Sequence, residues 1–234
     1  MQPTYLPWAG YFSLIKNVDK FVFLDNVQFN RDSWQSYNKI LFEKKTKKIK
    51  VPTIKRPLKT LLKDIEIDPS INWQKKHFDL IVKSYQNKPH YKNISKLINK
   101  IYLKSSYKYL VELNIDIIKE ISKILKINTK FYRSSLMDIK GIRSERIANI
   151  CDHLNCDSYI SPLGAYDYLT EDKFKKKYNI KLKFIKFNNI NYDQFKSNEF
   201  ISNLSIIDAL SFLELQFVID YLNNYSLVNQ IIKS

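Results

Sequence analysis

Polar side chains with the chemistry of an acid–base site follow the first predicted strand. The apolar run at 21–24 predicts a short buried strand, and Asp25 and Gln28 come soon after it. A carboxylate and an amide at this position can orient or deprotonate a substrate amine or hydroxyl, although acidic residues at strand ends also cap turns. We predict a substrate site in which Asp25 is the base or the amine-orienting group. Gln28 and Asn38 would contact polar substrate atoms, and Arg31 would pair with phosphate.

The histidines and cysteines of the chain predict no metal site and no cofactor. Cys151 and Cys156 flank His153, but their spacing matches no common zinc motif, and a helix-to-strand connection accounts for both thiols as core atoms. A cysteine nucleophile is an alternative, without any sign of a lowered pKa. His77 lies on the apolar face of a predicted helix, where a histidine is more often a core residue than a catalyst. We retain His77 as a second catalytic candidate.

A second polar stretch, Ser161–Tyr166, lies between a predicted strand and a predicted helix. Its backbone amides could hold an oxyanion or a phosphate, so Ser161 and the nearby Tyr168 are candidate binding residues. With one glycine, the stretch is a weaker signal than a phosphate-loop motif. Gln194 lies in a predicted turn and could add a polar contact.

The opening run, Gln2–Phe12, is the part of the scaffold that the sequence constrains most. Pro3 and Pro7 force an extended path, and Gly10 allows a close approach of the backbone or a positive φ. Three aromatic side chains are interleaved with them: Tyr5, Trp8 and Tyr11. These rings could stack on a substrate, or they could be ordinary core aromatics. We predict that this loop, Gln2 included, and Asp25 line one cavity.

The remaining pattern is typical of an α/β protein. A helix from Gly10 is followed by strands near 21–24, 40–42, 48–51, 130–132, 157–160 and 181–187. We predict a Rossmann-like, mostly parallel sheet in a single domain spanning 1–234, with a helical insertion at about 70–127. Such a fold normally has a strand directly before the opening loop. That strand is either absent or lies upstream of Met1.

The carboxyl-terminal part is predicted to be helical from Ser205 onward. Ser205–Asp208 has the spacing of a capping box, with Asp208 in the position usually held by Glu or Gln. This gives the motif a sufficient structural role, so we do not predict a substrate contact there unless a pocket lies beside it.

Composition excludes several classes of protein. The chain of 234 residues with 44% hydrophobic content is long enough to bury a full core. It has no uninterrupted apolar run of the roughly 18–20 residues that a membrane span needs and no signal-peptide pattern. Two cysteines give no disulfide framework, which favours a reduced, cytoplasmic setting. Homo-oligomers remain compatible with this composition.

The net charge of +16 comes mostly from lysine. Glu43–Lys63 alone holds nine basic residues and one acidic residue. A solvated lysine face is the simpler explanation, and an anion-binding patch is the alternative. RNA binding is a further hypothesis, which predicts an affinity that falls steeply with salt.

The motifs together resemble those of the WbqC-like family, which is encoded among bacterial surface-polysaccharide genes. The resemblance depends mainly on two runs, QPTYLPWAGYF at 2–12 and FVFLDNVQF at 21–29. It continues through Trp73 with His77, YISPLG at 159–164, and SIID at 205–208. Tyr37 stands where that family tends to have arginine.

The resemblance implies transfer of a glycyl or another aminoacyl group to the amine of a nucleotide-linked amino sugar for O-antigen synthesis. The acyl donor is open between an aminoacyl-tRNA and a carrier-protein thioester. A non-catalytic module that binds a nucleotide sugar or a partner in polysaccharide assembly is the alternative. The opening loop is also similar in spacing to the loop–helix signature of nucleotidylyltransferases. Trp8 and Tyr11 occupy the places of that signature's histidines, which argues against nucleotide transfer.

Overall fold

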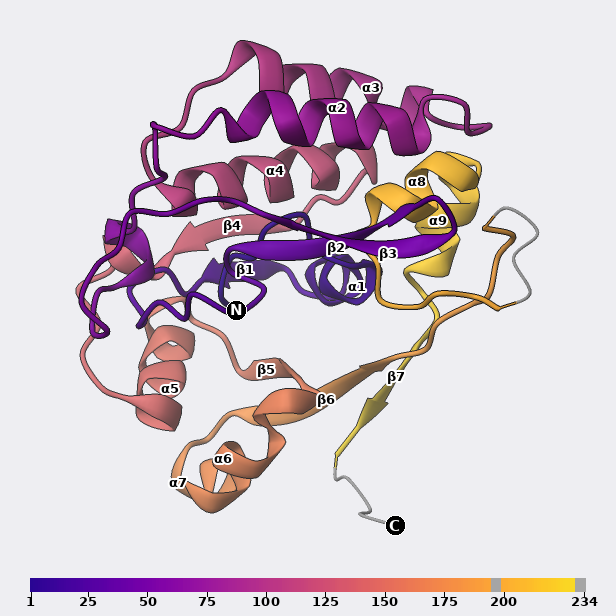
Figure 1. The fold of residues 1–234 in the computed structure, drawn as a ribbon. Coiled ribbons are helices and arrows are strands. Elements are labelled where there is room, and N and C mark those ends of the chain that lie inside the picture. The colour runs from indigo at the N-terminus through magenta and orange to yellow at the C-terminus, as the bar shows by residue number, and fades with distance from the viewer. Residues whose placement is uncertain (195–198, 230–234) are drawn as a thin grey trace.

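The computed structural model describes residues 1–194 and 199–229 and has a mixed α/β fold (Figure 1). The predicted α/β class is confirmed. Within the described residues the strands form three small sheets of two, two and three strands. No Rossmann-like sheet is shown among them, because the two parallel strand pairs are not hydrogen-bonded to each other.

The strands pair as follows. β1 (Lys20–Phe23) lies parallel to β4 (Lys130–Arg133), and β2 (Tyr37–Phe42) forms an antiparallel hairpin with β3 (Lys45–Lys50). β5 (Ser158–Pro162) lies parallel to β6 (Lys181–Phe187), and β7 (Tyr225–Val228) pairs antiparallel with β6. Residues 43–50 of the lysine-rich segment therefore form the turn and second strand of the β2–β3 hairpin, and residues 43–48 are exposed.

Helices surround these sheets. The α-helices are α1 (Ala9–Lys16), α2 (Trp73–Tyr85), α3 (Lys92–Asn99), α4 (Leu110–Ile124), α5 (Arg143–His153), α6 (Tyr166–Glu171), α7 (Phe174–Lys177), α8 (Ile207–Phe212) and α9 (Leu215–Tyr221). The short 3-10 helices are η1 (Leu62–Asp64), η3 (Ser134–Leu136) and η4 (Leu163–Ala165), and η2 (Lys100–Lys104) is a π-helical turn that continues α3. None of the described helices is long and apolar enough to cross a bilayer.

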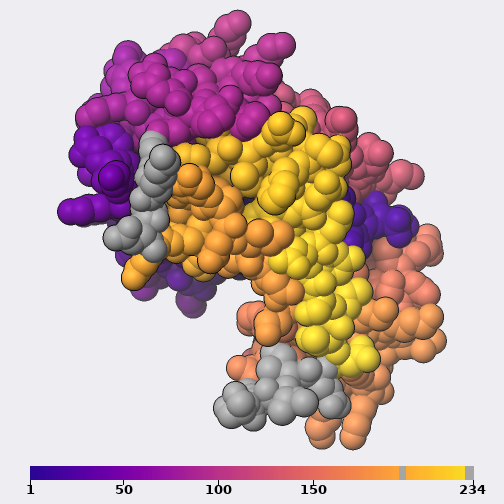
Figure 2. Space-filling model, turned by 90° about the vertical axis from the view of Figure 1, so that its right-hand side faces the viewer, coloured from indigo at the N-terminus to yellow at the C-terminus, as the bar shows by residue number. Residues whose placement is uncertain are grey.

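Two apolar clusters hold the fold together. The larger one joins the opening loop, α1, the strands β1–β3, the helices α2–α4 and the helices α8 and α9. The smaller one lies between α5, α6, α7 and the sheet of β5 and β6, around Phe174 and Phe184. In Figure 1, α2–α4 form a layer on one side of β1–β4, and the β5–β7 sheet with α5–α7 lies on the other. Figure 2 shows this second unit projecting from the main body.

Gly10 allows the Trp8 indole to fold back over the first turn of α1. A Cβ at Gly10 would lie 2.3 Å from Cη2 of that indole. The ring in turn packs edge-on against Phe187 at the end of β6, with 5.5 Å between ring centroids. Glycine at this position is thus explained by close approach of a side chain.

We expect Gly10→Ala to destabilise the protein by about 1–3 kcal/mol, because the indole must leave its position against Phe187. Alanine is the better helix former by about 1 kcal/mol, but a 2.3 Å contact outweighs that gain. Urea denaturation measures the change. Gly164→Ala is the matched control, since a Cβ there meets no atom within 4 Å, and it should stay within about 0.5 kcal/mol of the wild type. Equal stabilities of the two variants would contradict this account.

Candidate functional site

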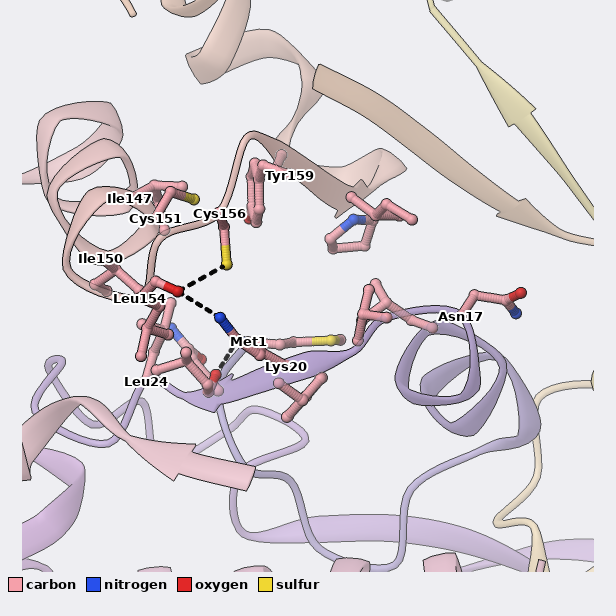
Figure 3. Close-up of a pocket in the computed structure, with 18 of the residues that line it drawn as sticks. Met1, Asn17, Lys20, Leu24, Ile147, Ile150, Cys151, Leu154, Cys156 and Tyr159 are labelled. Atoms are coloured by element: carbon pink, nitrogen blue, oxygen red, sulfur yellow. Dashed lines mark hydrogen bonds between the residues drawn. The ribbon is translucent and has the colours of Figure 1, made fainter. Parts of the chain in front are cut away.

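A cavity of about 580 Å³ lies between the β1–β4 pair and the β5–β7 sheet (Figure 3). Its walls come from four stretches: the first residues of the chain, β1 with the end of α1, residues 33–35, and residues 147–168. This volume is in the range of small-molecule sites. Figure 3 shows Met1 beside β1, facing Cys156 and Tyr159 on the opposite wall.

The polar rim of the cavity is built around an amide pair. The Gln35 side-chain nitrogen donates to the side-chain oxygen of Gln2 over 2.7 Å, and both residues line the cavity. Asn114 holds this rim from beneath, because its amide donates to the Gln35 carbonyl oxygen over 2.8 Å. Trp34 also lines the cavity, and its side chain is 45% exposed. An exposed indole beside two amides can stack on a base or a sugar ring and hydrogen-bond its polar edge.

The cavity wall formed by the end of α5 and the turn after it contains both thiols. Burial, together with the neighbouring Cys156, raises the pKa of Cys151 to about 11. Cys151 is therefore a thiol at neutral pH, not an activated nucleophile. The Lys20 ammonium reaches across from β1 and donates to the Leu154 carbonyl oxygen. No group of three metal-ligating side chains occurs within the described residues.

Asp25 lies directly after the cavity-lining Leu24 but is itself completely enclosed. Its carboxylate accepts hydrogen bonds from Arg133 Nε (2.8 Å), the Ser135 backbone (2.8 Å) and hydroxyl (2.6 Å), and the Ser134 hydroxyl (3.1 Å). Burial alone would raise the pKa of Asp25. The bonds from Ser135 and Arg133 outweigh it and hold the pKa below its ordinary value. The group is thus an ionised anchor that joins the ends of β1 and β4.

The three aromatic residues of the opening loop do not line the cavity. Tyr5 is fully buried, and its hydroxyl bonds to His77 Nδ1 (2.8 Å) and to the Tyr102 hydroxyl. Tyr11 is also buried, and its hydroxyl donates to the Gln2 carbonyl oxygen over 3.0 Å. Trp8 is half-buried beside a second, much smaller hollow. Tyr11 therefore supports the rim residue Gln2 from below.

Other predicted residues hold main chain in place. Asn38 is buried, and its amide donates to the carbonyl oxygens of Tyr5 (3.1 Å) and Leu6 (2.6 Å). This fixes the loop where Leu6 adopts a left-handed conformation, with φ of 43°. Gln28 is exposed and its backbone bridges to Leu61.

Arg31, Ser161 and Tyr168 differ in whether they reach the cavity. Arg31 is half-buried, and its carbonyl oxygen accepts from the Ser36 hydroxyl. Ser161 is buried within β5 and does not line the cavity. Tyr168 does line it and lies under the Arg143 guanidinium, 5.7 Å from the ring centroid. Of the predicted site residues, Gln2 and Tyr168 are thus the ones that reach the cavity.

Gln194 belongs to a separate buried cluster around Asp208. The Asp208 carboxylate accepts from the Tyr85 hydroxyl (2.9 Å), the Tyr192 hydroxyl (2.6 Å) and the Gln194 amide (2.8 Å). Burial raises the pKa of Asp208 in spite of these bonds. The carboxylate points into this cluster and does not close a capping box with Ser205, since Ile206 is the N-cap of α8 and has no side-chain cap.

His77 is a neutral core residue whose titration gives a test. Burial lowers the pKa of His77 from 6.5 to about 4, and a hydrogen bond with the Lys50 backbone offsets this only in part. Because the unfolded histidine binds its proton near pH 6.5, the stability contribution is complete above that pH and is lost as the pH falls towards 4.

We expect the wild type to lose about 2 kcal/mol of stability between pH 7.5 and pH 5 through His77. His77→Gln should lose less than the wild type over this range, since glutamine does not titrate. His153→Gln, a change at an exposed histidine, is the control and should keep the wild-type dependence. Chemical denaturation at pH 7.5 and pH 5 measures the loss of stability. Identical pH dependence of His77→Gln and the wild type would refute the lowered pKa of His77.

Comparison with known proteins identifies the family. The model of the WbqC-like protein family matches residues 2–218. The chain belongs to the WbqC-like protein family. A curated relative of this WbqC-like protein is "Uncharacterized protein Rv1507c" of Mycobacterium tuberculosis (strain ATCC 25618 / H37Rv), which is 29% identical over 175 residues. The alignment covers 74% of this chain and 75% of the relative. No solved structure matches this WbqC-like protein.

Proposed function

We propose that this WbqC-like protein transfers a glycyl or another acyl group to the amine of a nucleotide-linked amino sugar in surface-polysaccharide synthesis. The observation that supports this most is the composition of the cavity wall. The start of the opening motif, through Gln2, and the region after β5, through Tyr168, contribute to one cavity of about 580 Å³. Two stretches that carry the family resemblance thus meet around a space of ligand size.

The rim suggests how the nucleotide sugar would bind. Trp34 would stack on the base or the sugar, and the amides of Gln2 and Gln35 would bond to its polar edge. The Lys20 ammonium, inside the cavity, would move from the Leu154 carbonyl oxygen to a phosphate oxygen. Arg31 remains our proposed phosphate contact.

The reaction needs little beyond positioning. The amine nitrogen attacks the acyl carbonyl carbon, the bond from that carbon to the donor's sulfur or oxygen breaks, and a proton from the amine passes to the leaving group. Because the Asp25 carboxylate is enclosed and held ionised, we assign it a positioning role through Arg133, Ser134 and Ser135. The donor is an aminoacyl-tRNA or a carrier-protein thioester.

Incubation with labelled glycyl-tRNA or a glycyl carrier-protein thioester, plus a nucleotide-linked 4-amino sugar, tests the proposal. We expect an amide product by mass spectrometry, and Trp34→Ala should lower kcat/KM at least about tenfold. Phe217→Ala is the matched control, since Phe217 is 49% exposed and does not line the cavity. No amide product with either donor, under conditions where the sugar nucleotide binds, would overturn the transferase proposal.

A specific observation favours a second candidate, a non-catalytic module that binds the nucleotide sugar. Asp25 and His77 are both enclosed in networks of their own and do not line the cavity. Under this alternative, calorimetry would show sugar-nucleotide binding that Trp34→Ala weakens, with no product from any donor. Turnover above background would exclude it.

A further inference from the structure

Helix α5 ends in a turn that brings the two cysteines of the chain together. The Cys156 N–H donates to the Cys151 carbonyl oxygen over 2.8 Å, and the Asn155 N–H donates to the Asp152 carbonyl oxygen over 2.9 Å. Asn155 has a left-handed conformation, with φ of 51°. These two bonds around a left-handed residue are the Schellman ending of a helix. In this motif the side chains at the positions of Cys151 and Cys156 commonly pack on each other.

The placement of the two cysteines suits a disulfide. A disulfide requires Cα atoms about 4.4–6.8 Å apart and side chains that point towards each other. The direct backbone bond between Cys156 and Cys151 brings the two residues together without any further movement of the helix. The sulfurs are also close enough for Cys156 to contribute to the raised pKa of Cys151. Figure 3 shows both side chains on the same wall of the cavity.

The two thiols differ in exposure and in electrostatic surroundings. Cys151 is 6% exposed, whereas Cys156 is half-buried. The Cys156 thiol donates to the Leu154 carbonyl oxygen over 3.7 Å, and the Lys20 ammonium donates to the same oxygen. A positive charge therefore lies beside Cys156, where it attracts a thiolate. Cys156 is thus the thiol that a small oxidant in the cavity would meet first.

We propose that Cys151 and Cys156 are a reversible dithiol–disulfide pair in the cavity wall, oxidised by a small peroxide and reduced by a small thiol. The cavity of about 580 Å³ gives both reagents access to Cys156. Disulfides that are exposed to small thiols are the labile ones, so this cross-link is a reversible modification and not a structural staple. The inference concerns the chain's own thiols and is independent of the proposed transfer reaction.

The oxidation proceeds in two displacements. The Cys156 thiolate attacks one oxygen of hydrogen peroxide, the O–O bond breaks, and the leaving hydroxide takes up the proton that the thiol lost. The Cys151 sulfur then attacks the sulfur of the Cys156 sulfenic acid, the S–O bond breaks, and the Cys151 proton passes to the leaving hydroxide. Two thiols lose two electrons in total, and the peroxide becomes two waters. The disulfide fixes the turn between α5 and β5, which is part of the cavity wall.

Mass spectrometry of the folded protein after treatment with hydrogen peroxide tests the proposal. We expect a chain lighter by about 2 Da that no longer reacts with iodoacetamide. Dithiothreitol should then restore both reactive thiols. Both cysteines lie in one tryptic peptide, residues 147–173, so the mass loss should appear within that peptide. Cys151→Ala is the matched control: its Cys156 thiol should gain oxygen and lose no mass, because no second thiol is present to displace it.

A pair of variants at Asn155 tests the part played by the turn. Asn155→Gly keeps the left-handed conformation and should form the disulfide at about the wild-type rate. Asn155→Val opposes that conformation and should slow disulfide formation at least about tenfold. Circular dichroism checks that both variants are folded.

Three results would overturn the proposal. The first is a folded wild type that keeps both thiols under peroxide that oxidises Cys156 in Cys151→Ala. The second is oxidation of the wild type to disulfide-linked dimers in place of the internal cross-link. The third is an equal rate of disulfide formation in folded Asn155→Gly and Asn155→Val.

Discussion

Asp25→Asn is expected to destabilise the protein by about 3–5 kcal/mol, which corresponds to a fall in Tm of roughly 10 °C for a chain of this size. The amide group of asparagine replaces one of the two carboxylate oxygens. Its hydrogens would therefore face either Arg133 Nε, which donates to one oxygen, or the Ser135 N–H, which donates to the other. It also leaves the Arg133 guanidinium without its buried counter-charge, although Arg133 is itself 30% exposed, which moderates the loss. Thermal unfolding followed by circular dichroism measures the change.

The pH dependence of this effect has a defined sign. Because the pKa of Asp25 is held below its ordinary value of 3.8, its contribution is present above that pH and is lost as the pH falls below it. The wild type and Asp25→Asn should therefore converge in stability below about pH 4. Asp32→Asn is the control: its exposed carboxylate bonds to Lys50 over 2.9 Å, and its loss should change little. A wild-type Tm for Asp25→Asn at pH 7 would contradict the anchor role.

The second large effect is expected at Asp208. Asp208→Ala removes the shared acceptor of Tyr85, Tyr192 and Gln194, and leaves these buried donors unsatisfied. At about 1–3 kcal/mol for each unsatisfied group, with partial relaxation, we expect a loss of about 3 kcal/mol. The Tyr85 hydroxyl also accepts from the Leu41 N–H, so the change would loosen α2 from β2 as well.

Asp208→Asn distinguishes the charge from the hydrogen bonds. Burial raises the pKa of Asp208, so its stabilising contribution is present at low pH and is lost as the pH rises through the folded-state pKa. Asp208→Asn should therefore gain relative to the wild type as the pH rises from 4 to 7. Urea denaturation at both pH values measures the difference in stability, with Asp220→Ala, a change at an exposed residue of α9, as the control. Equal pH dependence of the wild type and Asp208→Asn would contradict the raised pKa.

Local pattern predicted much of the secondary structure. The apolar run at 21–24 and the alternation at 181–187 correspond to β1 and β6, and the helical spacing after Trp73 corresponds to α2. Hydrophobic periodicity and secondary-structure propensity are local signals, so they predict individual helices and strands. They do not determine which strands pair, and the expected Rossmann-like sheet depended on pairing.

The site was harder to predict because its contacts are distant in sequence. The sequence predicts a role for Asp25 as a strand-end acid, but its partner Arg133 is 108 residues away. The serines that follow β4 were the available signal, since the carboxyl ends of adjacent parallel strands meet. Gln35 had no signal at all: its place in the rim depends on Asn114, which is 79 residues further along the chain.

β6 is shared between the two apolar clusters. Ile185 belongs to the larger cluster. Leu182 and Phe184 point to the opposite face of the strand and belong to the smaller cluster. The two bodies on either side of the cavity are therefore coupled mechanically through β6, so that unfolding of either body releases packing in the other. Calorimetry should record one cooperative transition, and a ligand that bridges the cavity would stiffen both bodies at once.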